Sequence, residues 1–511
     1  MKLIRKFLLK FRSQIFLILV AAFALPQGVF SQNEPAPVTS NPGDAPELSN
    51  NDSANEKPLT VLKDWRWIQG AVFVPTNVVN EAQEWDEYDP EINDWELHYA
   101  SVYGINCVRV YLYYSIYLKK KDAFLEDIED FLTRADKYHI KVEFVFFDSC
   151  WNNPPDDILS SNYVYPAPID GVHNSRWLKG PSQDLLNNHY DENKESLKAY
   201  VQDVVNAHKD DPRIAFWETY NEPDKGSDAV SKLMADSLQW VHETGSQIPV
   251  TATGGEFKGD AYSDFKSWHQ YDPAYWLRRE PITSLCTECM NRKNQTVPGI
   301  VSNFKGKVGF IMWEFGIGRD NCRFSWDQKG NNPAKDENLA PFHGLVYPDG
   351  HPWSVDDVRA LLGEDAFAKA PLFKVQYFLD PTFTTPVKES VTPMIDFDLN
   401  DEKGTNVPDS SIKMPSTNWS VRWSGMIVAP QTGDYTFTVD GDNLVKVVVN
   451  DKIVVDKSQP ERAVATGSAA LSAGQSVPAV ISYVHGAGLS SLHVDWEGPG
   501  LAKQPLTPMP Q

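Results

Sequence analysis

Two glutamates follow short apolar segments of the chain. Glu222 follows residues 214–220 after one intervening residue, and Glu288 follows residues 281–285. Short apolar runs of this kind are typical of buried parallel strands. An ionised carboxylate at the end of a buried strand is costly unless a reaction or a ligand uses it. Two such carboxylates on strands of one barrel can break a glycosidic bond, one by protonating the leaving oxygen and the other by attacking the anomeric carbon.

Other polar and aromatic side chains recur at the ends of apolar segments. Asn221 precedes Glu222 and can hold a sugar hydroxyl, and Trp313 follows the last segment. A simpler interpretation is that Asn-Glu-Pro at 221–223 only begins a helix, because Glu in a first turn and Pro at the first helical position are common. Recurrence at several strand ends favours a site. The further candidates at strand ends are Arg109, His269 and Tyr271.

Aromatic residues are frequent in the segments that would surround this site. Flat aromatic faces stack on pyranose rings, although some of these residues would serve equally well as core. The connection at 148–189 is long for a segment that follows a strand, and such connections are usually functional or disordered. We therefore expect substrate contacts from Trp151, His173 and Trp177. The other aromatic residues expected near the rim are Tyr220, Trp268, Trp313 and Trp326.

The elements that would position these side chains alternate between residues 59 and 365. Short apolar segments are separated by stretches with helical period, such as 123–138 and 197–208. This alternation predicts an α/β fold, a (β/α)₈ TIM barrel, whose active site lies at the C-terminal strand ends. An open doubly wound sheet is the alternative, but no Gly-x-Gly-x-x-Gly follows the first strand. The expected strands are 68–74, 105–112, 140–147, 214–220, 248–253, 265–269, 281–285 and 308–312.

Counting strands chooses between two candidates for the attacking carboxylate. Glu314 stands in a Glu-Phe-Gly sequence, but placing it after strand 7 would require an eighth strand at 342–347, which Gly344 interrupts. If Glu288 follows strand 7, residues 308–312 form the eighth strand and the barrel closes with ordinary spacing. Glu314 would then point outward or into the rim. We therefore expect Glu288 to be the nucleophile.

These segments resemble those of a known group of enzymes. Residues 105–110, 217–223, 268–271 and 286–288 are similar to retaining glycoside hydrolases of the large (β/α)₈ clan, which includes cellulases, β-mannanases and β-galactosidases. The resemblance covers roughly residues 65–360. It implies that Glu222 is the acid/base and Glu288 the nucleophile, without a cofactor. The further site residues that it implies are Arg109, Asn221, His269, Tyr271 and Trp313.

The C-terminal part of the chain follows a different pattern. Period-2 runs such as 435–439 and 446–449, separated by Gly, Asp and Asn, predict a separate all-β domain at 370–507. Residues 375–378, 419–425, 433–437 and 496–500 resemble the PA14 domain, a β-sandwich found attached to glycosidases and adhesins. We expect this domain to be an accessory module that folds alone.

The PA14 resemblance raises the question of a calcium site. Some PA14 domains bind sugar through calcium held by an Asp-Asp pair, which corresponds here to Asp442 and Asn443. The missing carboxylate weakens such a site, because the charge count sets calcium affinity. Asp440 could replace it, so calcium stays open, and we assign no metal or cofactor to the chain.

The N-terminal residues have the pattern of a signal peptide at 1–31. Five basic residues precede the apolar run 15–25, and Val29-Phe30-Ser31 then places small residues where a signal peptidase reads them. That run is shorter than the about 20 residues that span a membrane, although a retained signal anchor is the alternative. Residues 32–58 have the composition of a disordered linker. We expect a secreted or periplasmic protein, with cell-surface association left open.

Charge and cysteine content limit the partners. Removing residues 1–31 takes away five positive charges and no negative ones, so the net charge falls from −22 to −27. Such a surface repels nucleic acids and anionic membranes, so neither partner is expected. Five cysteines are an odd number, so at least one does not pair within the chain. Cys286 and Cys289 point to opposite faces of a strand, which disfavours a zinc site.

The pattern as a whole predicts an exported retaining β-glycosidase. It would hydrolyse a neutral oligosaccharide or polysaccharide by a double displacement with two glutamates. The alternative is a glycan-binding protein whose barrel no longer cleaves anything. The complete Glu222 and Glu288 pair argues against that alternative. The particular sugar, endo or exo action and the oligomeric state are left open.

Overall fold

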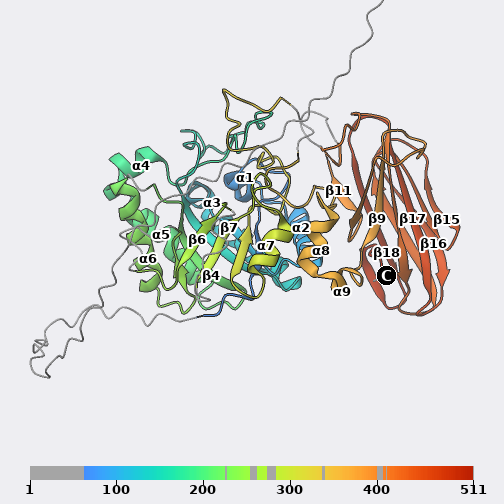
Figure 1. Cartoon of the computed structure of the whole chain (residues 1–511), viewed down its shortest axis with the longest axis horizontal. Coiled ribbons are helices and arrows are strands. Elements are labelled where there is room, and N and C mark those ends of the chain that lie inside the picture. Colours follow the sequence, from blue (N-terminus) through green and yellow to red (C-terminus); the bar gives the residue numbers. More distant parts are fainter. Residues whose placement is uncertain are drawn as a thin grey trace, which may run out of the picture. The chain divides into compact units, whose positions relative to one another are not determined.

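The computed structural model describes residues 63–224, 227–253, 262–272, 284–335, 340–399, 407–409 and 411–509 (Figure 1). The predicted signal peptide and the linker at 32–58 lie outside these residues. The segments after the fifth and sixth strands lie largely outside them as well. None of the described helices is long and apolar enough to span a membrane.

The first part of the chain is a nearly closed barrel of eight parallel strands, which confirms the predicted fold class. The strands pair in the order β5-β4-β3-β2-β1-β8-β7-β6. The first and last strands of the barrel, β1 and β8, therefore lie side by side. The strands are β1 (Gln69–Val72), β2 (Cys107–Tyr111), β3 (Lys141–Asp148), β4 (Ile214–Asn221), β5 (Val250–Thr251), β6 (Ser267–Gln270), β7 (Leu285–Cys289) and β8 (Gly309–Met312).

The seventh strand is displaced from its predicted position. The apolar run 281–285 suggested an early strand, whereas β7 begins at Leu285 and continues through Cys289. Its later residues pair with β6 and β8, and polar side chains occur there because the strand reaches the pocket. Glu288 therefore lies within the strand rather than after it, and the predicted bounds are wrong by about one strand length.

Helices surround the strands, and the local sequence specifies where they begin and which face they bury. Helix α2 begins where the Asp89 carboxylate accepts the backbone N–H groups of Glu91 and Ile92, an N-cap of the usual kind. Helix α5 buries Leu197 and Val201 on one face, as its period predicts. The helices are α1 (Glu81–Asp86), α2 (Pro90–Val102), α3 (Tyr114–Lys137), α4 (Gln183–Asn188), α5 (Tyr190–Ala207), α6 (Asp228–Glu243), α7 (Val297–Phe304), α8 (Val355–Leu362) and α9 (Glu364–Phe367).

The N-terminal end of the barrel is filled by aromatic side chains. Trp65 packs against Phe216 and Phe265, with ring centroids 5.4 and 4.6 Å apart. Gly309 begins β8 against this cluster, where a Cβ would lie 2.2 Å from the Trp65 carbonyl oxygen. A larger residue there would push β8 aside, so glycine is required. This packed end holds the strands in place, so their opposite ends can carry polar side chains in a fixed arrangement.

The C-terminal part is an antiparallel β-sandwich with its own core. One sheet has the order β10-β9-β12-β17-β14-β15, and the other has β11-β18-β13-β16 with β19 on β18. Trp419 and Trp423 are buried between them. The strands are β9 (Phe373–Phe378), β10 (Lys388–Thr392), β11 (Asp396–Asp398), β12 (Trp419–Val428), β13 (Gly433–Gly441), β14 (Leu444–Val449), β15 (Lys452–Lys457), β16 (Ala463–Leu471), β17 (Ser476–His485), β18 (Ser491–Gly498) and β19 (Leu501–Pro505).

Candidate active site

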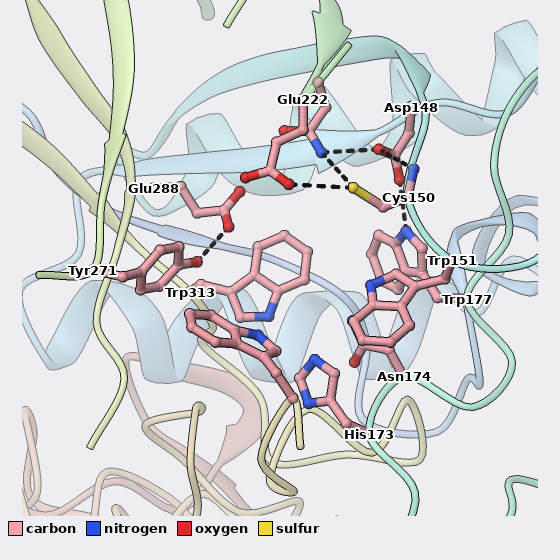
Figure 2. Close-up of a pocket in the computed structure, with 12 residues that line it drawn as sticks. Asp148, Cys150, Trp151, His173, Asn174, Trp177, Glu222, Tyr271, Glu288 and Trp313 are labelled. Carbon is pink, nitrogen blue, oxygen red and sulfur yellow. Dashed lines mark hydrogen bonds between the residues drawn. The ribbon is translucent and has the colours of Figure 1, made fainter. Parts of the chain in front are cut away.

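The two glutamates meet in one pocket at the C-terminal ends of the barrel strands. Glu222 directly follows β4, and Glu288 lies in β7. The pocket has a volume of about 350 Å³. Its lining residues are Asp148, Cys150, Trp151, His173, Asn174, Trp177, Asn221, Glu222, Tyr271, Glu288, Trp313 and Trp326 (Figure 2).

The structure brings all ten predicted site residues together. Eight of them line the pocket, and the other two, Arg109 and His269, contact its glutamates. Sequence reasoning missed Asp148, Cys150 and Asn174. The sequence pattern could have indicated Asp148, because this residue ends β3 in the same way that Asn221 ends β4. Asn174 had none, since it lies in a long irregular connection.

His269 lies between the two glutamates. Its Nδ1 is 2.7 Å from Glu222 Oε1 and 3.4 Å from Glu288 Oε2. One polar atom from each of the three side chains lies within 4.8 Å of the others. This spacing could also hold a metal ion, but an ion there would occupy both carboxylates. His269 thus hydrogen-bonds Glu222 and lies in ion-pair distance of Glu288, so the three groups form a closely coupled trio.

Glu288 is positioned by two donors, one that directly follows β6 and one in β2. The Tyr271 hydroxyl donates to its Oε1, and the Arg109 Nη1 group lies 3.4 Å from its Oε2. Both contacts stabilise the ionised carboxylate and fix the direction of its oxygens. Glu288 therefore has the environment that a positioned anion or nucleophile needs.

Arg109 is fully buried beneath the pocket and contacts several polar side chains there. Its Nη2 donates to Glu218 Oε1 at 2.6 Å and to Asn221 Oδ1 at 2.8 Å. Its Nε donates to Glu143 Oε1 at 3.2 Å. Burial and the neighbouring Glu218 raise the pKa of Glu143 well above its usual range, so Glu143 is neutral. Sequence reasoning missed both of these supporting glutamates, because nothing in the local pattern separates them from strand residues.

Asp148 joins the strand ends to the long connection after β3. Its Oδ1 accepts from Asn221 Nδ2 at 2.9 Å and from the Cys150 backbone N–H at 3.0 Å. Its Oδ2 accepts from Trp177 Nε1 at 2.8 Å. Asn221 is thus held between Asp148 and Arg109, and its side chain supports the site rather than standing free for a sugar.

Cys150 contacts the second glutamate directly. Its Sγ lies 3.4 Å from Glu222 Oε2. Burial and the nearby carboxylates raise the pKa of this thiol well above its usual range. Cys150 therefore stays protonated and donates to Glu222.

The proton balance of the pocket differs from the expected one. An acid/base that must protonate the leaving oxygen first should have a raised pKa, but the pKa of Glu222 is lowered in this pocket. Desolvation alone would raise the pKa of Glu222. The hydrogen bond and the charge of His269 outweigh desolvation and lower this pKa to about 2. Part of its side chain, 46%, is nevertheless exposed. Burial instead raises the pKa of Glu288 to about 7, although His269 and Arg109 oppose this.

The expected aromatic rim is confirmed only in part. Trp151, Trp177, Trp313 and Trp326 line the pocket (Figure 2). Tyr220 is buried and its hydroxyl pairs with Ser149 at 3.0 Å. Trp268 packs outside the pocket against Phe304, with ring centroids 6.0 Å apart. Those two residues serve the core, because side chains of successive strand residues alternate between the faces of the sheet.

Glu314 lies outside the pocket lining. Strand β8 ends at Met312, so the strand count that favours Glu288 agrees with the structure. The Glu314 side chain is only 1% exposed, so it packs inside the protein rather than in solvent. It lies beside Asp320 and Cys322. Burial, followed by the charge of Asp320, raises its pKa well above the usual range, so Glu314 is protonated there.

The residues of the expected calcium position do not fit a cation. Asn443 Oδ1 accepts from the Gly486 backbone N–H at 3.0 Å, and Asp442 Oδ2 accepts from Ser491 Oγ at 2.8 Å. The Lys457 ammonium donates to the carbonyl oxygens of residues 443, 459 and 461 at 2.6, 2.8 and 2.8 Å. These bonds use all three of its N–H groups. A side-chain cation thus takes the carbonyl oxygens that calcium would need.

The cysteines do not pair with one another. Cys107, Cys150, Cys286, Cys289 and Cys322 are all free. Cys286 and Cys289 are buried in β7 and donate to different backbone carbonyls, those of Glu288 and Ile311. The two thiols also lie close enough to interact with each other, so the expected placement on opposite faces of the strand is wrong. Each already donates to a backbone carbonyl, which supports structural roles.

Comparison with known proteins identifies the C-terminal part of the chain. Residues 382–506 match the PA14 domain, so the predicted PA14 resemblance is confirmed. No curated protein matches the sequence. Solved structures similar to the chain include an anti-sigma factor domain-containing protein from Clostridium clariflavum, which is 25% identical with a TM-score of 0.25. That match covers 27% of this chain and 45% of the other, so the chain spans less than half of that relative.

Two glycoside hydrolase structures are also among the similar ones. The β-mannanase of the blue mussel Mytilus edulis is 12% identical, covering 51% of this chain and 87% of that chain with a TM-score of 0.36. A Streptomyces cattleya protein described as GH5_18, in complex with GlcNAc, is 12% identical with a TM-score of 0.39. That match covers 58% of this chain and 78% of the other.

Proposed function

We propose that this chain is an exported retaining β-glycosidase that hydrolyses a neutral glycan. The observation that carries the proposal is the pairing of Glu222 and Glu288 in one pocket, with His269 between them. Two carboxyl groups on strand ends of one barrel are the equipment that glycoside hydrolysis requires. The PA14 domain is the accessory module of this enzyme.

The close approach of the two carboxylates supports retention of configuration. Retaining enzymes keep their carboxyl groups about 5–5.5 Å apart, whereas inverting enzymes separate them by about 6.5–9.5 Å to admit a water molecule. Oxygens of Glu222 and Glu288 lie within 4.8 Å of each other. This close approach of single oxygens favours the shorter spacing of retaining enzymes.

The proposed reaction has two steps. Glu288 attacks the anomeric carbon and forms a glycosyl ester, while Glu222 gives its proton to the glycosidic oxygen and the leaving alcohol departs. A water molecule then attacks the ester, passes a proton to Glu222 and frees the Glu288 carboxylate. The proton that Glu222 needs comes from the His269 Nδ1–H, 2.7 Å away, when the bound sugar excludes water from the pocket.

The charges of the pocket favour an uncharged substrate. Among the described lining residues, Asp148, Glu222 and Glu288 are acidic, and none is lysine or arginine. An anionic sugar such as a uronic acid would be repelled and left without a counter-ion. Four tryptophans supply flat apolar faces instead, which suit the faces of neutral pyranose rings.

A substrate panel tests the proposal. The full chain is incubated with nitrophenyl glycosides and with β-glucans, mannans and xylans, and products are detected by mass spectrometry. We expect cleavage of at least one neutral β-glycoside, and loss of that activity by Glu222→Gln and Glu288→Gln. Saturable binding without any product would instead favour a glycan-binding protein.

The stereochemistry is tested separately by NMR of the first product. The proposal expects the β-anomer to appear first. Initial release of the opposite anomer would exclude the double displacement, because only one displacement would then have occurred.

A further inference from the structure

Two long connections meet across one side of the pocket. One follows β3 and contains residues 149–182, and the other follows β8 and contains residues 313–354. The His173 backbone N–H donates to Gln328 O at 2.9 Å, and the Ala334 N–H donates to Gly171 O at 2.7 Å. The strand order places β1 and β2 between β3 and β8. The two connections therefore bridge over that side of the barrel mouth.

The junction between these connections is closely packed. Gly171 has a φ of +72°, and a Cβ there would lie 2.6 Å from the Ala334 carbonyl oxygen. The His173 ring donates through Nδ1 to Phe324 O at 2.5 Å and lies 5.6 Å from the His343 ring. His173 itself is 2% exposed. The two connections are therefore packed firmly together. We call their junction, which includes residues 171–174, Phe324 and Ala334, the wall of the pocket.

This wall lies across the pocket from the acid/base. Figure 2 shows Glu222 on one side and His173 and Asn174 on the opposite side. In the proposed reaction Glu222 protonates the leaving oxygen, so the departing part of the glycan lies on the Glu222 side. The sugar attacked by Glu288 lies between that side and the wall. A further sugar attached beyond it would collide with the wall.

Asn174 supplies an independent sign that a ligand contacts the wall. It lines the pocket and is 2% exposed, yet its Oδ1 has no hydrogen-bond partner among the described residues. Leaving a buried acceptor unpaired costs about 1–3 kcal/mol. Its backbone also adopts a φ of +41°, which is uncommon for a residue other than glycine. A ligand hydroxyl that donates to Oδ1 would satisfy this acceptor.

The neighbouring His173 is suited to the same task. Burial lowers the pKa of His173 to about 4, so its ring is neutral at ordinary pH. Because the Phe324 carbonyl can only accept, Nδ1 carries the ring proton and Nε2 remains an acceptor. The neutral Nε2 of His173 can accept a hydrogen bond from a hydroxyl of any uncharged sugar.

We propose that the pocket is a dead end that admits only the terminal sugar at the non-reducing end of a glycan, with Asn174 Oδ1 accepting a hydrogen bond from a hydroxyl of that sugar. The enzyme then removes monosaccharides one at a time from the chain end. This inference rests on the proposed glycosidase function and adds exo action to it. The pocket volume of about 350 Å³ agrees, because it lies at the lower end of the about 300–1,000 Å³ of ligand sites.

Product analysis provides the first test. Short oligosaccharides of the sugar that the enzyme cleaves, labelled at the reducing end, are sampled early in the reaction. We expect free monosaccharide together with labelled products shortened by one unit at a time. Early products shortened by several units would show internal cleavage, and that result would overturn the inference while leaving the glycosidase function intact.

A binding test separates failure of the inference from failure of catalysis. The Glu288→Gln variant is titrated with oligosaccharides whose non-reducing end is either free or capped by a cyclic acetal. The dead-end pocket should bind the capped form at least about tenfold more weakly. Equal binding of both forms would overturn the inference. If the panel is neither bound nor cleaved, the proposed function and the inference fail together.

The role of Asn174 is tested with a backbone-compatible variant. Asn174→Gly keeps access to positive φ and removes the acceptor, so we expect KM for the terminal sugar to rise about tenfold, as for the loss of one hydrogen bond. Asn174→Asp keeps an acceptor at the same place and should restore much of the affinity. Asn162→Gly, an exposed position in the same connection, is the matched control. Unchanged KM in Asn174→Gly would exclude the assigned contact.

Discussion

At the scale of single residues, the chemistry depends on the trio Glu222, His269 and Glu288. In the empty pocket, the charges of the two glutamates outweigh burial and raise the pKa of His269 above its usual value. Glu288 has a pKa raised to about 7, and Glu222 is ionised. Three such close groups titrate together. Substrate binding must therefore move a proton toward Glu222 before the leaving group can depart.

A pH profile tests this arrangement. The nucleophile must be ionised, so kcat/KM should fall as the pH drops below about 7, the pKa of Glu288, rather than below an ordinary Glu value near 4.5. Tyr271→Phe removes a donor that favours the ionised form, so the acidic limb should move to still higher pH.

The matched control for this profile is Tyr220→Phe. The Tyr220 hydroxyl pairs with Ser149 and does not line the pocket. The acidic limb of the pH profile of Tyr220→Phe should coincide with that of the unchanged protein. An acidic limb near pH 4.5 in the unchanged protein would contradict the raised pKa of Glu288.

Substitution with rescue distinguishes the nucleophile from its competitor. Glu288→Ala should lose on the order of 10⁴-fold or more in rate, because the covalent step is lost. Added azide should restore turnover by taking the place of the carboxylate. Glu314→Ala should retain the chemistry, since Glu314 is protonated and lies outside the pocket lining. Azide rescue in Glu314→Ala, with activity retained in Glu288→Ala, would reverse the assignment.

The residues of the site differ in how far the sequence can predict them. Glu222, Glu288 and His269 follow apolar runs, so a strand count is enough to place them at one end of the barrel. Asn174 depends on the path of a long connection, which no local period specifies. The pKa of Glu222 depends on His269, which is 47 positions away in the sequence, so the contact cannot be inferred from neighbouring residues.

At the scale of elements, the connection after β3 is fastened by Asp148. Asp148→Asn places an amide against the Trp177 Nε1–H or the Cys150 N–H, which then loses its acceptor. We expect a stability loss of about 1–3 kcal/mol and a rise in KM, because the wall of the pocket loosens. Thermal unfolding and tryptophan fluorescence measure these effects.

An exposed aspartate in the same connection provides the comparison. Asp157→Asn changes the same chemical group at an exposed position. It should leave both KM and stability within error of the unchanged protein. Equal effects of Asp148→Asn and Asp157→Asn would show that Asp148 does not fasten the connection.

The loop between β15 and β16 carries the prediction about calcium. Lys457→Met leaves three carbonyl acceptors without their donor, so the domain should lose about 1–3 kcal/mol or more of stability. The exposed Lys452→Met on the same strand is the control. Millimolar calcium or a chelator should leave the Tm of the unchanged protein in place, because a ligand stabilises only a site that it can occupy. A rise of several degrees with calcium would contradict this.

The strand bounds show where sequence patterns lose information. Seven of the eight predicted barrel strands overlap the observed ones over most of the observed length, since buried parallel strands are apolar along their length, and the eighth shares only Leu285 with β7. Strand β7 departs from that rule, because Thr287 and Glu288 lie within it beside the pocket. An apolar criterion therefore fails where a strand contributes most to the site.

At the scale of the whole molecule, the relation of the barrel to the PA14 domain decides what the second domain does. All described residues that line the pocket lie between positions 148 and 326, so none belongs to the PA14 domain. Buried hydrogen bonds nevertheless join the two regions. Tyr99 in α2 donates to Asp396 O at 2.5 Å, and Tyr377 in β9 donates to Asp349 Oδ2 at 2.7 Å.

Removal of residues 373–511 tests whether the second domain acts only as an accessory module. The pocket stays complete, so turnover of a small aryl glycoside should remain within about threefold, a difference of less than 1 kcal/mol. The buried partners of Tyr99 and Asp349 are lost, so the Tm should fall. Activity on a polymer should fall more than activity on the aryl glycoside if the domain holds the glycan. A truncated barrel that precipitates or loses most turnover on the small substrate would instead make the domain structural, because the pocket would then depend on contacts outside its own lining.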